Sequence, residues 1–266
     1  MILTTKTVEK PWGREKLPAI FDRVQGRRIG EIWFEPPEAM PGLLVKYLFT
    51  SDKLSVQCHP SDAQTLAAGL GRQGKEECWL VIEAEPGAKL GIGFDEAIDG
   101  DAMRAAALDG SIEHLMAWHD VQAGDFFYIP ANTVHAIGAG VTIIEIQQNS
   151  DITYRLFDYG RPRDLHLDEG VKVADGSPYA AKLHKKLPAS GHASLVDGPF
   201  FRLDLVDGIP DEALLYSYAE PLLTIPIAGE ILLSSKHVVK PGECALAQDL
   251  ASIAFAPSGK CLIARP

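Results

Sequence analysis

The chain has no apolar run approaching the length of a membrane span, and its amino terminus, MILTTKTVEKPWG, lacks the apolar segment of a signal peptide. Basic residues are also few: 25 Lys and Arg stand against 36 Asp and Glu, which gives a net charge of −11. We therefore expect no membrane partner and no nucleic-acid partner. A small anionic substrate is still compatible, because local charge in a pocket can oppose the overall sign.

Cysteine is scarce too, and no two residues form a C-x-x-C pair; the four are Cys58, Cys78, Cys244 and Cys261. They are too sparse for a disulfide framework, so we predict a reducing, cytoplasmic location. Cys58 stands between Gln57 and His59, and strand alternation would point its thiol to the opposite face. We interpret it as a small buried side chain.

The 266 residues suit one large domain or two modest ones, and 46% hydrophobic with 23% charged residues is ordinary for a globular protein. Most of the chain shows short apolar or alternating runs separated by turn residues, which favours an antiparallel sandwich or barrel. The predicted strands of the first half cover residues 42–50, 54–59, 77–84, 125–131, 141–148 and 153–159.

One interval breaks this pattern, a run rich in Ala, Leu and Met over residues 95–118. We predict a helical insert there between two strands. Ser111 is the expected N-cap of its second short helix, which would carry Ile112, Leu115 and Met116 on one side.

A change of character after residues 177–192 predicts two domains, 1–185 and 193–266. The second shows further short strands, and its histidine, His237, has no neighbour at ligand spacing. We predict a smaller β-barrel that contributes packing and stability and holds no metal.

Candidate metal ligands appear in the stretch LSVQCHP. Gln57 and His59 are two residues apart, so on a strand they project to one face. Glu77, at the start of a later strand, and His135, after a turn, would complete a set of two imidazoles, a carboxylate and an amide. Zn²⁺ suits this set, although the ligand types alone do not exclude Mn²⁺, Fe²⁺ or Co²⁺.

The second histidine belongs to a recognisable motif. The spacing of Gly124, Pro130, Asn132 and His135 resembles the second motif of the cupin superfamily, with Asn132 where that motif usually has glycine. Asparagine tolerates the left-handed backbone best among residues with a side chain, so the replacement is mild.

Several motifs in order resemble type I mannose-6-phosphate isomerases, the zinc-dependent cupin phosphomannose isomerases, in their short bacterial form. They are KPWGREKL, IGEIWF, LSVQCHP, GKEECW, GDFFYIPANTVHAIG and EIQQNSDITYRLFDYGR, and they cover most of residues 8–170. The resemblance implies a mainly β fold of cupin-type jelly-roll barrels, with an N-terminal catalytic barrel and a smaller C-terminal one. It also implies one Zn²⁺ per chain on Gln57, His59, Glu77 and His135.

The residues alone leave Glu76 and Glu77 as equal candidates for the carboxylate ligand, because adjacent residues of a strand point to opposite faces. The resemblance selects Glu77.

The implied reaction interconverts mannose 6-phosphate and fructose 6-phosphate through an enediol(ate). Arg155 matches an active-site arginine of the family, and Lys75 and Glu145 are the other predicted catalytic residues. Arg161, Glu31 and Trp12 are predicted to contact the substrate. Arg163 completes a basic cluster suited to a sugar phosphate.

Two other functions are compatible with a metal-binding cupin. One is a non-catalytic sensor that binds a sugar phosphate, and the other is a cupin iron oxygenase. Retention of Arg155, Lys75 and Glu145 favours the isomerase over the sensor, and Gln57 in a position where histidine is usual speaks against the oxygenase. The sequence leaves open whether the protein is a monomer or a homodimer.

Overall fold

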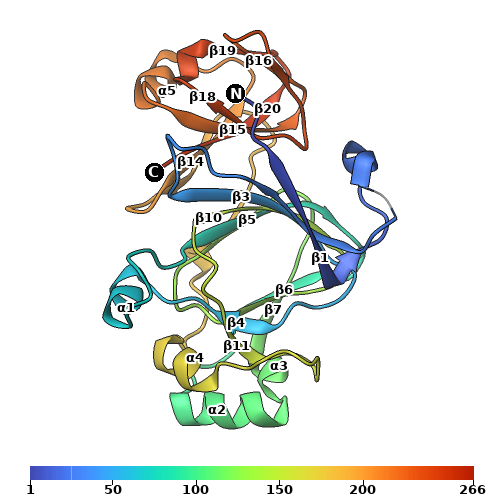
Figure 1. Cartoon of the computed structure of the whole chain (residues 1–266), viewed down its shortest axis with the longest axis vertical. Coiled ribbons are helices and arrows are strands. Elements are labelled where there is room, and N and C mark those ends of the chain that lie inside the picture. Colours follow the sequence, from blue (N-terminus) through green and yellow to red (C-terminus); the bar gives the residue numbers. More distant parts are fainter. Residues whose placement is uncertain (25) are drawn as a thin grey trace.

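The computed structural model describes residues 1–24 and 26–266 (Figure 1). The chain is mainly β, as predicted, and its strands form four sheets with antiparallel pairing. Among the described residues, no helix is long and apolar enough to cross a membrane.

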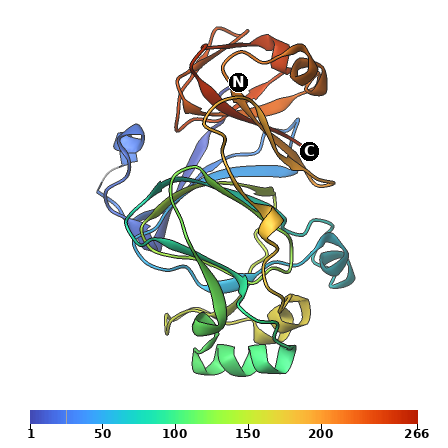
Figure 2. The same ribbon diagram turned by 180° about the vertical axis from the view of Figure 1, so that it is seen from behind.

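The first 190 or so residues build two sheets that face each other (Figures 1 and 2). The larger sheet has seven strands, in the order β1 (Thr5–Arg14), β2 (Ile29–Phe34), β3 (Leu43–Phe49), β10 (Val141–Gln148), β5 (Glu77–Ala84), β8 (Asp125–Ile129) and β12 (His184–Lys186). The smaller has five, in the order β11 (Tyr154–Phe157), β4 (Val56–Cys58), β9 (His135–Ile137), β6 (Lys89–Phe94) and β7 (Met116–Asp120).

Three helices cover the outer face of the five-stranded sheet: α2 (Gly100–Asp109), α3 (Ile112–Leu115) and α4 (Leu167–Val173) (Figure 1). Met103, Ala107 and Ile112 pack there against Val56 and Leu156 of the sheet. A fourth helix, α1 (Asp62–Ala67), lies between β4 and β5 in the chain and projects to one side.

The predicted insert over 95–118 corresponds to α2 and α3, but its last residues are not helical. Met116 begins β7, where it pairs with Phe94, so it does not share a helix face with Ile112. Leu115 is 37% exposed rather than buried. Ser111 precedes α3 without a capping hydrogen bond from its side chain.

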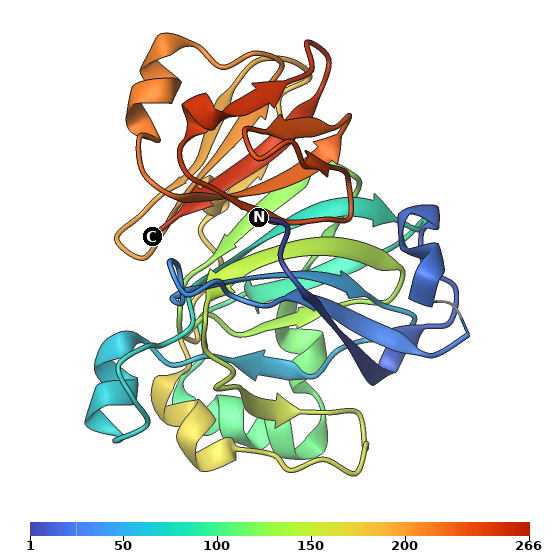
Figure 3. The same cartoon turned by 45° about the horizontal axis from the view of Figure 1, so that its top comes forward.

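Residues after 190 form two further sheets, which Figure 3 shows above the seven-stranded sheet. The first contains β13 (Ala193–Asp197), β14 (Arg202–Asp207), β20 (Lys260–Arg265), β15 (Leu222–Ala228) and β18 (Ala245–Ala247), and the second β17 (Val238–Val239), β16 (Ile231–Leu233) and β19 (Ile253–Phe255). The remaining elements are α5 (Glu212–Ser217) and the short helices η1 (Ala19–Val24), η2 (Ala181–Leu183) and η3 (Leu250–Ser252). The division into domains 1–185 and 193–266 stays a prediction.

The C-terminal strands cover the outer face of the seven-stranded sheet. Leu203 and Leu262 share a hydrophobic core with Tyr47 of β3 and with Ile144 and Ile146 of β10. Because side chains alternate along a strand, the residues between these face the opposite side of the sheet, toward the five-stranded sheet. The seven-stranded sheet is thus buried on both faces, one apolar and the other carrying the charged side chains described below.

A close approach of backbones fixes β9, the strand that begins with His135. The amide of Gly138 donates to the carbonyl of Lys89 over 3.0 Å. A Cβ on Gly138 would lie only 2.2 Å from that carbonyl oxygen.

We expect Gly138→Ala to lower the free energy of unfolding by about 1–3 kcal/mol, because the added methyl group forces β9 and β6 apart. Urea unfolding followed by tryptophan fluorescence measures it. Gly42→Ala is the matched control, since its Cβ would meet its nearest atom at 3.6 Å. Equal stability of the two variants would contradict the close approach.

Candidate functional site

A cavity of about 530 Å³ lies on the charged face of the seven-stranded sheet. Its walls come from β1, β2, β3, β5 and β10 on one side and from residues around β4 and β11 on the other. Lys46, Lys75, Glu77, Glu145 and Arg155 all line it, so the cavity is strongly polar. Such a lining suits a small, charged ligand.

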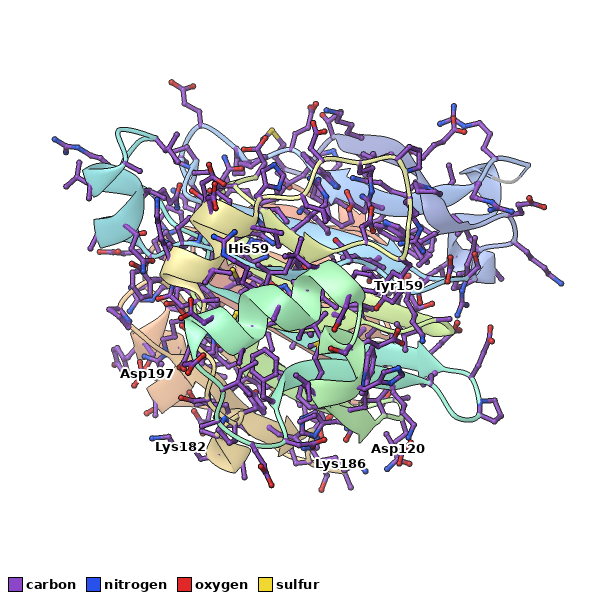
Figure 4. The ribbon with its side chains drawn as sticks, turned by 90° about the horizontal axis from the view of Figure 1, so that it is seen from below. His59, Asp120, Tyr159, Lys182, Lys186 and Asp197 are labelled. Atoms are coloured by element: carbon purple, nitrogen blue, oxygen red, sulfur yellow. The ribbon has the colours of Figure 1, made fainter. Side chains whose placement is uncertain are left out.

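Three predicted ligands meet beside this cavity. His59, Glu77 and His135 each offer a ligand atom, and these atoms lie within 4.8 Å of one another. Their exposed fractions are 2%, 1% and 1%. His59 follows β4 directly rather than lying on it, and Figure 4 labels it in a view from the side of α2. Gln57 pairs with His135 across β4 and β9, which places the fourth predicted ligand at the same point.

Both imidazoles are oriented for a metal. Nδ1 of His59 donates to the carbonyl of Ile152, and Nδ1 of His135 to that of Thr133, each over 2.9 Å. Burial lowers the pKa of His59 and lowers that of His135 to about 3. Both rings are therefore neutral at pH 7 and present the lone pair of Nε2, rather than a proton, to the cluster, as a metal ligand must.

One carboxylate oxygen of Glu77 is a buried hydrogen-bond acceptor without a donor in the part of the chain that the structure describes. Its Oε1 is buried, receives no hydrogen bond from the described residues, and lies 3.4 Å from Nε2 of His135. Its Oε2 contacts the ammonium of Lys75 and lies 3.7 Å from Nε2 of His59. Burial raises the pKa of Glu77 to about 7, although Lys75 opposes the shift. An unsatisfied buried acceptor is costly, and a cation between the ligands would satisfy it.

Gln57 can complete the set. Its amide nitrogen lies 3.3 Å from Nε2 of His135, and its Oε1 accepts from the hydroxyl of Ser55 over 2.9 Å. Rotating the amide by half a turn exchanges the two atoms, and Ser55 can then accept instead of donate. Two imidazoles, a carboxylate and an amide oxygen fit a divalent metal such as Zn²⁺.

The neighbouring residues agree with the predicted orientation of this strand. Glu76 points away from the cluster and accepts a hydrogen bond from the hydroxyl of Tyr128 over 2.6 Å. Asn132 has a φ of 74°, the left-handed conformation expected from its place in the motif. The Sγ of Cys58 lies 3.6 Å from the carbonyl of Gly170 in α4, on the outer side of the sheet.

A buried chain of charges runs from the ligands along the cavity. Nζ of Lys75 lies 3.1 Å from Nε2 of His59 and 3.8 Å from the carboxylate of Glu145. Glu145 also accepts from Nζ of Lys46 over 3.2 Å and from Nε1 of Trp79 over 3.1 Å.

These charges fix each other's protonation. Burial alone would raise the pKa of Glu145, but Lys75 and Lys46 overcome it and lower that pKa to about 2. Burial alone would lower the pKa of Lys75, but Glu145 and Glu77 raise it. At neutral pH Glu145 is therefore ionised and Lys75 is protonated.

Lys46 is the site residue that the sequence reasoning missed. It pairs laterally with Trp33 on β2 and with Glu145 on β10, and its ammonium lies 4.6 Å from the centroid of the Trp33 ring. A signal was present in the sequence, because Lys46 is the single charge in the apolar strand LLVKYLF. A charge buried in a strand needs a partner, which Glu145 supplies.

The predicted substrate contacts are only partly brought together. Glu31 and Trp12 line the cavity, and Glu31 is held by Lys10 at 3.5 Å and by Nε1 of Trp33 at 2.6 Å. Arg155 lines it with a buried Nε that donates to none of the described residues. Arg163, the other member of the predicted basic cluster, lines the cavity, whereas Arg161 does not and instead pairs with acidic side chains.

No family model matches the chain. It is 42% identical over 167 residues to a mannose-6-phosphate isomerase of Streptococcus mutans, covering 60% of this chain and 52% of the relative. It is 40% identical over 139 residues to mannose-6-phosphate isomerase ManA of Bacillus subtilis, covering 50% and 44%. The matches thus span about half the length of these curated relatives.

The fold is shared over the whole chain. A mannose 6-phosphate isomerase structure from Bacillus subtilis superposes with a TM-score of 0.80 at 23% identity, covering 100% of this chain and 99% of that one. A mutant phosphomannose isomerase from Salmonella typhimurium gives 0.73 at 14% identity, covering 99% and 98%. The resemblance predicted from the motifs is confirmed in both sequence and fold.

Because the pKa of Glu77 is about 7, Zn²⁺ must displace a proton from it in slightly acidic solution. We expect binding to release more protons at about pH 6 than at about pH 8.5, because the raised pKa leaves Glu77 protonated only in the more acidic solution. Calorimetry in buffers of different ionisation enthalpy measures the release.

Glu76→Gln is the matched control, since this carboxylate points away from the ligands and its loss should leave the profile unchanged. Release that rises with pH would contradict the assignment to Glu77.

Proposed function

We propose that the protein catalyses the reversible isomerisation of mannose 6-phosphate and fructose 6-phosphate. The observation that carries this proposal is that a candidate metal-ligand cluster and a cavity lined by charged side chains lie side by side. The buried ligand cluster of His59, Glu77 and His135 lies beside a cavity that also contains a protonated lysine, an ionised glutamate and the arginine Arg155. The sequence similarity to mannose-6-phosphate isomerases supports the choice of substrate.

The reaction moves a proton between C1 and C2 of an open-chain sugar phosphate. Its barrier lies in removing a weakly acidic proton next to a carbonyl, which places negative charge on the oxygens of an enediolate. The site must therefore bind two neighbouring oxygens, stabilise negative charge on them and hold a proton close by.

We assign the metal role to one Zn²⁺ per chain on Gln57, His59, Glu77 and His135. The bound ion supplies Lewis-acid stabilisation of the enediolate oxygens. The neutral, fixed imidazoles and the unsatisfied oxygen of Glu77 support this choice of ligands. The buried, unpaired state of the four cysteines agrees with the proposed cytoplasmic location.

Lys75 and Glu145 form a buried charge pair that places an acidic proton beside the ligand cluster. The ammonium of Lys75 lies next to the ligand cluster and can donate to an enediolate oxygen. Glu145 keeps Lys75 protonated in the resting site, because its carboxylate is ionised and only 3.8 Å away. With a pKa of about 2, Glu145 is suited to organising the lysines rather than to removing the C2 proton.

Arg155 supplies the positive charge for the enediolate. Its Nε lacks a partner among the residues in the structure, so it is available to an anion in the cavity. Glu31 and Trp12 then contact the neutral part of the sugar, Glu31 by accepting a hydroxyl hydrogen bond and Trp12 as an apolar wall.

A coupled assay for fructose 6-phosphate formed from mannose 6-phosphate tests the proposal. We expect turnover by the zinc-loaded protein, loss of turnover after chelation, and recovery when Zn²⁺ is added back. His135→Ala should lose zinc and activity together, since it removes one of the ligands. Full activity in verified metal-free protein would refute the metal role, and tight sugar-phosphate binding without turnover would support a sensor.

Replacing Arg155 separates charge stabilisation from metal binding. We expect Arg155→Gln to reduce kcat about 10²–10³-fold while zinc content stays at one per chain, because one oxyanion donor is removed. Steady-state kinetics with metal analysis measures both. Arg104→Gln is the control, since Arg104 pairs with Asp168 between α2 and α4 at 2.6 Å and does not line the cavity. An equal loss in both variants would contradict the role of Arg155.

A further inference from the structure

Two arginines, Arg155 and Arg163, face the same cavity from one wall. Arg155 lies on β11 and Arg163 on the loop that follows it. Burial lowers the pKa of Arg155, and the nearby guanidinium of Arg163 lowers it further. Two cations that face one cavity repel each other, and an anion bound there would relieve the repulsion.

A buried carboxylate outside the cavity holds Arg163 in place. Asp158 is 2% exposed, and its two oxygens accept from Nε and Nη2 of Arg163, each over 2.6 Å. This bidentate geometry fixes the plane of the guanidinium. A guanidinium has five N–H donors, so Arg163 keeps others for a ligand in the cavity.

Asp158 binds a second arginine, which ties this loop to the one before β4. Arg161 donates to Asp158 over 3.1 Å, to the carboxylate of Asp52 over 2.6 Å and to the carbonyl of Lys53 over 2.8 Å. Three residues after Asp52 comes Ser55, which binds the amide of Gln57. The same carboxylate therefore connects the Arg163 loop with the segment that leads to the metal ligands.

The loop between β11 and Arg163 contains a residue in an unfavourable backbone conformation. Tyr159, labelled in Figure 4, has a φ of 53°, a left-handed conformation that is unfavourable for a bulky residue. Its ring lies 5.4 Å from the guanidinium of Arg161. Asp158 precedes Tyr159 in the chain, and its partners Arg161 and Arg163 follow. The ion pairs therefore span Tyr159, stabilise this backbone conformation and fix the position of Arg163.

We infer that Asp158 is a positioning residue that holds Arg163 at the cavity wall as the contact for the phosphate group of the substrate. The inference rests on the proposed function for the identity of the substrate. It reverses the expected order of the two arginines, since Arg161 serves the structure of the loop and Arg163 faces the ligand.

The test uses inorganic phosphate as the probe, with calorimetry on the zinc-loaded full chain, and mannose 6-phosphate for kinetics. Arg163→Ala and Asp158→Asn should each weaken phosphate binding about 10-fold to 100-fold and raise KM similarly, because a charged hydrogen bond is lost or misdirected. We expect kcat to change by less than about threefold, since the enediolate end of the site is untouched.

The double variant decides whether Asp158 acts through Arg163. We expect Asp158→Asn with Arg163→Ala to bind phosphate no more weakly than Arg163→Ala alone. Additive losses would overturn the positioning role, and phosphate binding by Arg163→Ala at the wild-type level would overturn the contact itself. Arg104→Ala is the control for loss of an arginine, with wild-type values expected.

Two further outcomes are separable. If thermal melts show that Asp158→Asn is unfolded, Arg163→Gln still tests the contact, because this side chain is 26% exposed and its replacement leaves the core intact. If the wild type binds phosphate in an Arg163-dependent way but does not turn over mannose 6-phosphate, the proposed function fails and the phosphate contact stands.

Discussion

The carboxylate of Glu145 lies at the centre of β10, and the polar face of the seven-stranded sheet is organised around it. A carboxylate at this depth needs positive partners, and Lys46 and Lys75 provide them from both sides. Lys75 in turn reaches Glu77, so the charges alternate in sign from the cavity to the ligand cluster. Removing one charged side chain would leave its partner buried and unpaired. The resulting loss of folding free energy is larger than the net stabilisation that the ion pair itself provides. The site is therefore one electrostatic unit rather than a set of independent side chains.

This unit depends on the alternation of side chains in strands that are covered on both faces. On β10, Ile144 and Ile146 pack against the C-terminal sheet, whereas Glu145 between them lines the cavity. A shift in register by one residue would exchange the two faces and place the Glu145 carboxylate in the apolar core. The C-terminal strands thus help to position the charged side chains of the cavity without contributing one, because their apolar contact with the outer face of the sheet stabilises its register.

Local patterns in the sequence predicted much of this arrangement. The strands β5 and β10 begin and end at the predicted residues, and the predicted catalytic residue Lys75 contacts the predicted ligand Glu77. Strands β1, β2, β6 and β9 lie outside the predicted set. Of these, Lys89–Phe94 contains two glycines, and His135–Ile137 is too brief to show a period. The sequence favoured Arg161 over Arg163 as the substrate contact, whereas Arg163 lines the cavity. Both lie in one loop, and only the fold shows that Asp52, more than a hundred residues away in the chain, binds Arg161.

The candidate metal ligands can be predicted from local sequence motifs, whereas the charged side chains around them cannot. Gln57, His59 and His135 are brought together by pairing between two short strands, and each side chain points where strand geometry or a local carbonyl directs it. The charges that tune them come from strands distant in the chain, β3 and β10, whose lateral register no local pattern specifies. Lys46 illustrates this. As a lone lysine in an apolar strand it suggests an edge or an error of assignment, and only its position opposite Glu145 makes it part of the site. The protonation of these side chains is thus set by tertiary register, whereas the grouping of the candidate metal ligands follows local motifs.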